Sequence, residues 1–275
     1  MTEGRYYSKY IAAMEEEGVP IWGITIQNEP EAKQVRDSCL YTGEEEWDFI
    51  KNHLGPSLEK LGFGDVKIII WDHNRNVIFE RSQAVLSDPE AAKYVWGTGV
   101  HWYVSEEFEN LSKVHDAFPD KHLIFTEGCI KGGPQAGEWH TGERYGRNII
   151  GDLNNNLEAW IDRNLVLNEE GGPNHVGNYC DASVIVDTKK DEVHYNSSYY
   201  YIGHFSKFIK PGARRIGIQA SNNRILATVF ENINGETVAV MMNENDSIEE
   251  VSLSLGGDSM MLVLPERSIA TVIIH

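Results

Sequence analysis

Several acidic, amide, imidazole and phenol side chains follow short apolar segments of the sequence. They are Asn28 and Glu29, Asp72 to Asn74, His101 and Tyr103, and Glu127. A carboxyl group can act as nucleophile, general acid or general base. Two of them about 5–5.5 Å apart are the arrangement that hydrolyses glycosides with retention of configuration. Glu29 and Glu127 are the candidates for such a pair.

These residues need elements that bring them together. The first two thirds of the chain alternates strand-like and helix-like segments, which indicates a parallel sheet covered by helices. Candidate strands lie near residues 21, 66, 99, 122 and 164, and nearly continuous apolar character predicts burial on both faces. Because function gathers at the carboxyl ends of parallel strands, we expect the polar residues to meet at one edge.

Helices are predicted between the strands from apolar residues at helical spacing. The predicted stretches are 7–14, 47–61 with a bend near Gly55-Pro56, 77–86, 108–118, a long helix whose stripe runs from Ile149 through Leu157 to Trp160, and 199–208. After Pro211-Gly212 the pattern changes to short alternating strands, and Asn234-Gly235 predicts a hairpin turn. We therefore expect an α/β domain over residues 1–208 and an antiparallel β domain over 209–275.

The composition limits the class of partner. With 24 basic and 42 acidic residues the formal charge is −18, so phosphate backbones and anionic membranes are repelled and nucleic acid is not expected as a partner. No apolar run is long enough for a membrane span. Three cysteines, an odd number without metal-type spacing, favour a reducing compartment over a disulfide framework. A cytoplasmic location is favoured, with secretion open if residues precede Met1.

Each candidate also has a structural interpretation. A glutamate after a strand is commonly a solvated loop residue or a helix cap, and Asp72, His73 and Asn74 could be caps. His101 could be a buried histidine bonded to backbone. Trp139, in a polar loop, could be core rather than a platform for a sugar. A metal site from His73, His101 and acidic neighbours is conceivable, but the spacing matches no metal motif.

The motifs together resemble glycoside hydrolase family 30, the glucosylceramidase-like group. Four segments carry the resemblance in the same order: Trp22-Gly-Ile-Thr-Ile-Gln-Asn-Glu-Pro30, Val100-His-Trp-Tyr103, Phe125-Thr-Glu-Gly128, and Trp160 to Asn174. The β domain at the end of the chain also fits this family. The resemblance implies an incomplete (β/α)8 TIM-type barrel with about five strand–helix units, followed by an antiparallel β-sandwich-like domain.

The resemblance also implies the roles of the site residues. Glu127 is expected to be the nucleophile and Glu29 the acid/base, its pKa raised by the neighbouring carboxylate until Glu127 is glycosylated. Asn28 is expected to bond the sugar 2-hydroxyl, and Tyr103 to orient Glu127 beside His101. Trp139 and Asn178 are expected to contact the substrate at the rim. No cofactor and no metal is implied.

The sequence departs from the family in two ways. The family's acid/base lies on the fourth barrel strand, whereas here it lies on the first, and five strands cannot close an eight-stranded barrel. Either a separate chain supplies the rest or the open edge is covered by self-association; we expect a homo-oligomer. Arg163 replaces an aromatic residue, so it either changes the pocket wall or pairs with a carboxylate such as Asp162 or Glu158.

These observations predict an exo-acting retaining β-glycosidase of β-glucosidase or glucosylceramidase type, acting on a β-linked glycoside through two glutamates. The alternative is a catalytically weak or inactive fragment that binds carbohydrate or only assembles.

Overall fold

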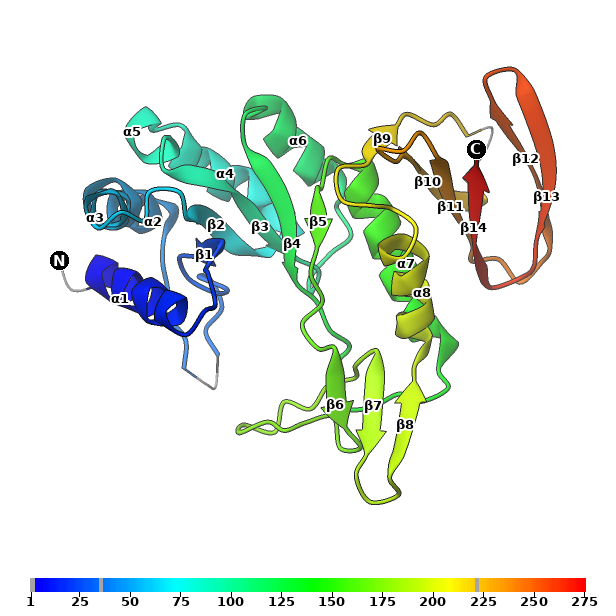
Figure 1. The fold of residues 1–275 in the computed structure, drawn as a ribbon, viewed down its shortest axis with the longest axis horizontal. Helices are drawn as coiled ribbons and strands as arrows, with labels where there is room; N and C mark the ends of the chain where they lie inside the picture. Colours follow the sequence, from blue (N-terminus) through cyan, green and yellow to red (C-terminus); the bar gives the residue numbers. More distant parts are fainter. Residues whose placement is uncertain (1–2, 35–36, 221–222) are drawn as a thin grey trace. The chain divides into compact units, whose positions relative to one another are not determined.

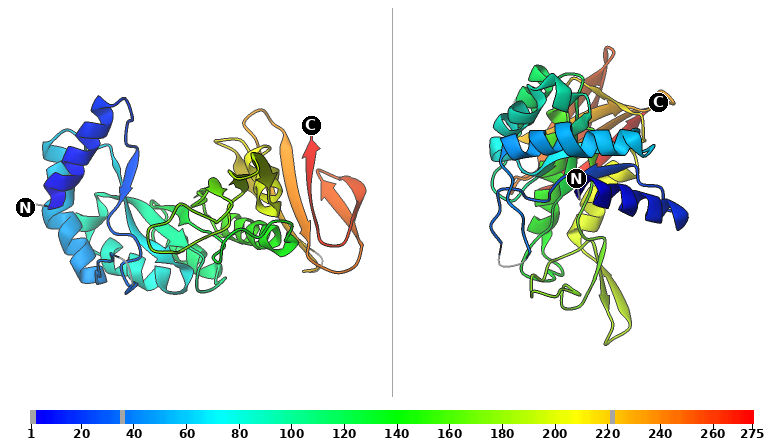
Figure 2. Two further views of the ribbon diagram at one scale, coloured as in Figure 1. Left: turned by 90° about the horizontal axis from the view of Figure 1, so that it is seen from below. Right: turned by 90° about the vertical axis from the view of Figure 1, so that its left-hand side faces the viewer.

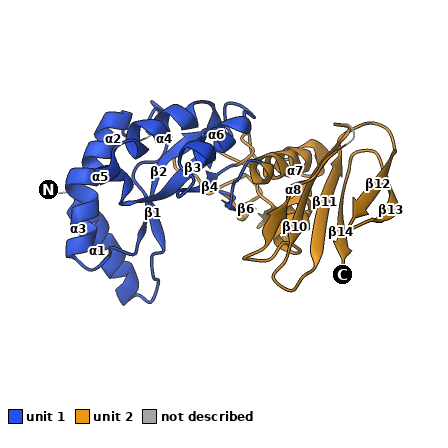
Figure 3. Cartoon of the chain, turned by 90° about the horizontal axis from the view of Figure 1, so that it is seen from above, with its two compact units in different colours: residues 1–128, 155–163 blue, residues 129–154, 164–275 orange. Residues whose placement is uncertain are grey.

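The computed structural model describes residues 3–34, 37–220 and 223–275. The chain divides into two compact units, coloured separately in Figure 3. Unit 1 holds residues 1–128 and 155–163, and unit 2 holds residues 129–154 and 164–275.

A parallel sheet forms the centre of unit 1 (Figure 1). In the described residues its strands follow the order of the sequence, and each pairs in parallel with the next. The strands are β1 (Gly23–Thr25), β2 (Lys67–Asn74), β3 (Val95–His101), β4 (His122–Glu127) and β5 (Ala159–Trp160). Parallel neighbours in sequential order are the arrangement of part of a (β/α) barrel, so the predicted incomplete barrel is confirmed.

Helices connect these strands and cover one face of the sheet (Figure 1). They are α1 (Glu3–Glu16), α2 (Gly43–Phe49), the π-helical turn η1 (Ile50–Leu54), α3 (Gly55–Lys60), the 3-10 turn η2 (Arg75–Val77), α4 (Ile78–Leu86), α5 (Pro89–Ala92) and α6 (Glu109–Ala117). The start of α2 is fixed by a capping box, in which Thr42 and Glu45 bond each other's backbone N–H groups. The predicted bend at Gly55-Pro56 lies where η1 meets α3.

The core of unit 1 lies between the sheet and these helices. Ile11 of α1, Leu54 of η1 and Ile70 of β2 are fully buried in it. The strands approach closely at Gly97, where an added Cβ would lie 2.2 Å from the carbonyl oxygen of His122. Only glycine fits there, so the β3–β4 spacing depends on this residue.

Unit 2 contains two helices and three small sheets in the described residues. The helices are α7 (Trp139–Asn154) and α8 (Ser197–Ser206), and the strands are β6 (Val166–Asn168), β7 (Val184–Asp187), β8 (Glu192–Tyr195), β9 (Arg214–Ile216), β10 (Ile225–Glu231), β11 (Thr237–Asn243), β12 (Glu249–Leu255), β13 (Asp258–Leu264) and β14 (Ser268–Ile274). The antiparallel order β14-β11-β10-β9 has α7 and α8 on one face and the hairpin β12–β13 on the other (Figure 2).

Some sequence predictions were wrong in position. The fifth strand of the parallel sheet is residues 159–160, whereas the segment at 164–168 contributes β6 to a separate sheet with β7 and β8. Helix α7 ends at Asn154, so Leu157 and Trp160 lie outside it, and Trp139 begins this helix rather than lying in a loop. The β7–β8 hairpin and β9 were not predicted.

The antiparallel β region is confirmed, and its hairpin turns at Asn234-Gly235. The boundary between residues 208 and 209 stays a prediction, since the compact units divide the chain elsewhere. Among the described helices, none combines the length and the apolar character that crossing a bilayer requires.

Candidate active site

The carboxyl ends of the parallel strands in unit 1 bring several polar side chains together. Glu29 follows β1, Asp72 lies near the end of β2, and His101 closes β3. Glu127 closes β4, next to His101 in the strand pairing. All except Glu127 are buried, and Glu127 is half-buried.

The backbone near the acidic residues is irregular. Glu29, Trp71 and Asp72 have φ angles of 49°, 68° and 50°, in the left-handed region that residues with side chains rarely adopt. The pairing of β2 with β3 shifts register between Trp71 and His73, which marks a bulge. The Glu29 N–H donates to the Asp72 carbonyl oxygen at 3.0 Å, so the bulge also holds the backbone of Glu29. Such strain in the backbone gathers at functional sites.

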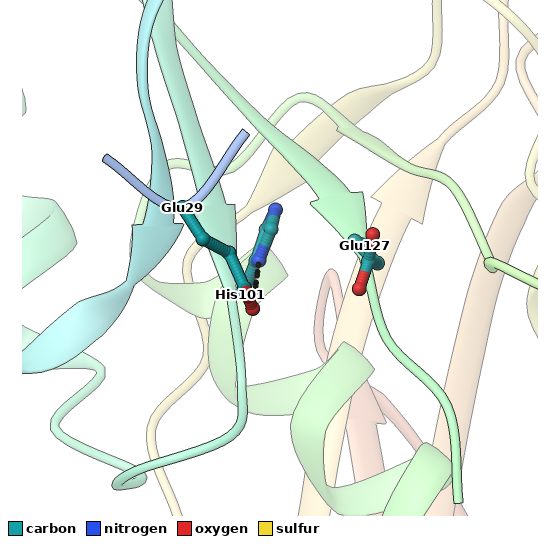
Figure 4. A group of neighbouring side chains, drawn as sticks. All are labelled: Glu29, His101 and Glu127. Atoms are coloured by element: carbon teal, nitrogen blue, oxygen red, sulfur yellow. Dashed lines mark ion pairs between the residues drawn. The ribbon is translucent and has the colours of Figure 1, made fainter. Parts of the chain in front are cut away.

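The two glutamates meet at His101. A carboxylate oxygen of Glu29, one of Glu127 and a ring nitrogen of His101 all lie within 4.8 Å of one another. Figure 4 shows Glu29, from the segment after β1, and Glu127, at the end of β4, on either side of the His101 ring. This spacing between carboxylate oxygens is compatible with the separation that a retaining pair needs.

His101 is fully buried and contacts two acidic groups. Its Nε2 lies 3.0 Å from Asp72 Oδ1, and its Nδ1 lies 3.5 Å from Glu29 Oε1. Burial acts to lower the pKa of His101, but the contacts with Asp72 and Glu29 outweigh it and raise that pKa to about 9. Burial acts to raise the pKa of Asp72, but the hydrogen bond with His101 outweighs burial. The pKa of Asp72 is therefore lowered. Asp72 and His101 therefore form a buried ion pair beside Glu29.

Glu127 receives two hydrogen bonds on the same oxygen. The Tyr103 hydroxyl donates to Oε1 at 2.9 Å, and Nη1 of Arg163 donates to Oε1 at 3.1 Å. The guanidinium of Arg163 thus pairs with Glu127, a partner that the sequence analysis did not name. The two donors fix the orientation of the carboxylate.

A cavity of about 330 Å³ opens on the face of the sheet next to these groups. Asn28, Asp72 and Glu127 line it together with Thr25 and Thr126. Asn28 is exposed, with its carbonyl oxygen accepting from the Gln27 side chain. Asn28 and Glu127 therefore line the same cavity.

Two predicted rim residues belong to unit 2. The Trp139 indole N–H donates to the Arg267 carbonyl oxygen at 2.7 Å, and its ring lies edge-on to Tyr201. The backbone N–H of Asn178 donates to Asn174 Oδ1 at 3.0 Å. Their contact with a sugar stays a prediction.

Sequence reasoning did not include Asp72 or Arg163 among the site residues. Asp72 was noted at the end of a strand, but a helix cap explained it equally well. The missing signal is the bulge, because an inserted residue changes the direction of the side chains around it. Arg163 was noted because it departs from the family's motif. Its partner Glu127 could not be predicted, because it is not among the residues near Arg163 in the sequence.

The parallel sheet, with two glutamates and a histidine gathered at its carboxyl edge, is the arrangement of part of a (β/α)-barrel domain. The glycosyl hydrolase family 30 TIM-barrel domain matches residues 2–209, and the glycosyl hydrolase family 30 beta sandwich domain matches residues 212–272. The chain belongs to glycosyl hydrolase family 30.

Individual relatives agree with this assignment. Lysosomal acid glucosylceramidase of Mus musculus is 37% identical over 267 residues, which are 92% of this chain and 51% of that protein. The structure of SrfJ from Salmonella typhimurium superposes with a TM-score of 0.95 at 32% identity, covering 98% of this chain and 61% of that one. An endo-beta1,6-glucanase structure gives 0.85 at 30% identity, with the same coverage. The chain spans about half the length of the curated relative.

Proposed function

We propose that this protein is a retaining β-glycoside hydrolase with Glu127 as nucleophile and Glu29 as acid/base. The observation that supports this most is the approach of the two carboxylates to within 4.8 Å beside a cavity. We also propose that the activity is exo-acting and of the glucosidase type.

In the first step, a Glu127 oxygen attacks the anomeric carbon and forms a carboxylate ester with the sugar. The bond from the anomeric carbon to the leaving oxygen breaks, and protonated Glu29 gives its proton to that oxygen. Since Tyr103 and Arg163 both donate to Oε1, we propose Oε2 as the attacking atom. The donors restrain rotation of the carboxylate during the attack.

In the second step, ionised Glu29 takes a proton from water, whose oxygen attacks the anomeric carbon and releases Glu127. Glu29 therefore changes charge twice in each cycle. Asp72 balances the charge of protonated His101 beside Glu29. We propose that Glu29 alternates between its neutral and ionised states during the cycle, as the mechanism requires.

The proposed substrate is a β-linked glucoside, because relatives include a glucosylceramidase and an endo-beta1,6-glucanase. We propose that Asn28 donates to a hydroxyl of the sugar next to Glu127. Trp139 and Asn178 are proposed as further substrate contacts.

The test is hydrolysis of aryl β-glucosides by the wild type, Glu127→Gln and Glu29→Gln. We expect turnover by the wild type and losses of at least ~100-fold in both variants. Azide should restore activity to Glu29→Gln on a substrate with an activated phenol, because an anion can replace the base in the second step. Equal trace rates in all three proteins would contradict the proposal.

A second candidate function follows from the length of the match. The chain spans about half the length of the glucosylceramidase that it matches. The corresponding proposal is a fragment that binds carbohydrate or assembles without turnover. Saturable binding of a glucoside with no hydrolysis would favour it.

A further inference from the structure

We propose that the buried ion pair of Glu46 and Arg81, remote from the sugar, positions the acid/base Glu29. This inference rests on the proposed function. Glu46 lies in α2 and Arg81 in α4, on the helical layer that covers the sheet. Both act on Glu29 through the backbone and side chains between them.

The first connection runs through the bulge in β2. Glu46 is 1% exposed, and its Oε1 accepts the backbone N–H of Trp71 at 2.9 Å. Trp71 and Asp72 are the two residues of β2 with positive φ. The hydrogen bond that this amide donates to the buried Glu46 carboxyl group compensates for a backbone conformation that the regular strand pairing does not support. Glu46 therefore holds the bulge in place.

Asp72, fixed by this bulge, reaches Glu29 in two ways. Its carbonyl oxygen accepts the Glu29 N–H at 3.0 Å, and its carboxylate holds His101, whose other nitrogen faces Glu29 Oε1. A displacement of the bulge would therefore move both the backbone of Glu29 and the imidazole beside its carboxyl group.

The second connection runs through Arg81. Its Nη2 lies 3.1 Å from Glu46 Oε2, and its guanidinium lies over the Trp71 ring, 4.9 Å from the centroid. Its Nη1 also donates to Glu31 Oε1 at 3.2 Å and to the Tyr41 carbonyl oxygen at 3.0 Å. Glu31 is two residues beyond Glu29, so one guanidinium ties the loop after the acid/base to the bulge.

A positioning role for the acid/base has a kinetic signature that a general loss of structure does not have. Protonation of the leaving oxygen matters greatly for an alkyl β-glucoside and little for a dinitrophenyl β-glucoside, whose phenolate leaves unaided. In Glu46→Ala we expect kcat/KM to fall ~100-fold for the alkyl substrate and less than ~3-fold for the dinitrophenyl one.

Conservative variants extend the test. Glu46→Gln keeps an acceptor for the Trp71 N–H and should lose less than ~10-fold on the alkyl substrate. Arg81→Lys keeps the charge but not the several simultaneous contacts, and should again lose more on the alkyl than on the dinitrophenyl substrate. If Glu46→Ala does not fold, Glu46→Gln and Arg81→Lys test whether the ion pair positions Glu29.

The matched control is Asp88→Ala, which removes the N-cap of α5 in the same unit and touches none of these residues. This variant should change kcat/KM for the alkyl and the dinitrophenyl substrate by the same factor. Equal losses on both substrates in Glu46→Ala and Arg81→Lys would overturn the inference and leave the proposed function intact. A folded wild type that hydrolyses neither substrate would instead contradict the proposed function, and the inference with it.

Discussion

At the residue scale, the nucleophile depends on the two donors to Glu127 Oε1. Tyr103→Phe removes one of them while keeping the ring. A hydrogen bond to a charged group contributes about 1.5–3 kcal/mol, so we expect kcat/KM to fall roughly 10–100-fold. The measurement is kcat/KM for a dinitrophenyl β-glucoside, because its phenolate leaves without protonation by Glu29. Tyr10→Phe, at an exposed position in α1, is the control, and an unchanged rate in Tyr103→Phe would contradict the role.

His101 links stability to pH at the same scale. Its pKa in the folded protein is raised from 6.5 to about 9, against the effect of burial. Protonated His101 therefore stabilises the fold fully below about pH 6.5, and this stabilisation is lost as pH rises through about 9. The contribution is at most about 3 kcal/mol, counted once for the pair with Asp72.

The measurement for His101 is the free energy of urea unfolding from about pH 6 to pH 9.5. The wild type should lose stability across this range, and His101→Gln should show a smaller dependence because the titrating group is gone. Parallel curves for the two proteins would count against a charged His101.

At the element scale, the spacing of β3 and β4 places His101 next to Glu127. Gly97→Ala would bring a Cβ to 2.2 Å from the His122 carbonyl oxygen. We expect this overpacking to lower the free energy of unfolding by about 1–3 kcal/mol. In Gly64→Ala the added Cβ meets its nearest neighbour at 3.7 Å, so this control should unfold almost as the wild type does. Similar midpoints for both variants would refute the explanation for Gly97.

The elements themselves were predictable where local patterns are strong. The segments of β2 and β4 follow from apolar runs that end in polar residues, and the bend before α3 follows from Gly55-Pro56. β5 could not be found in this way, because its two residues, Ala159 and Trp160, are strand only through pairing with β4. Tertiary contact, which a single sequence does not display, decides such short elements.

Site geometry was predictable only in part for a similar reason. Glu29 and Glu127 follow strands and could be identified from that position. Glu46 lies in a run of three glutamates that resembles an exposed helix start, and only the fold shows that it is buried beneath Trp71. The positive φ angles at Trp71 and Asp72 also could not be predicted from the sequence, since neither residue is a glycine.

At the scale of the whole molecule, the parallel sheet of unit 1 ends at β1 and β5 in the described residues and does not close into a barrel. Because unpaired strand edges favour association, we expect a homo-oligomer at micromolar concentration. Sedimentation velocity over a concentration series should show a species larger than the 31.1 kDa monomer. A stable monomer throughout the series would refute this expectation.

Long-range contacts at this scale also exceeded what the sequence could predict. Cys129 and Cys180, separated by 51 positions, bring their Sγ atoms to 3.5 Å. The odd number of cysteines gave no reason to expect that two of them would be neighbours. Arg163 and Glu127, 36 positions apart, meet in the same unforeseen way.

The most direct test of the mechanism is covalent trapping of the nucleophile. A glucosyl donor with a good leaving group and fluorine in place of the 2-hydroxyl forms the glycosyl-enzyme but slows its hydrolysis. After proteolysis, mass spectrometry should find the sugar on the peptide containing Glu127, and Glu127→Gln should give no adduct. An active wild type that carries the label on another residue would contradict the assignment of Glu127 as the nucleophile.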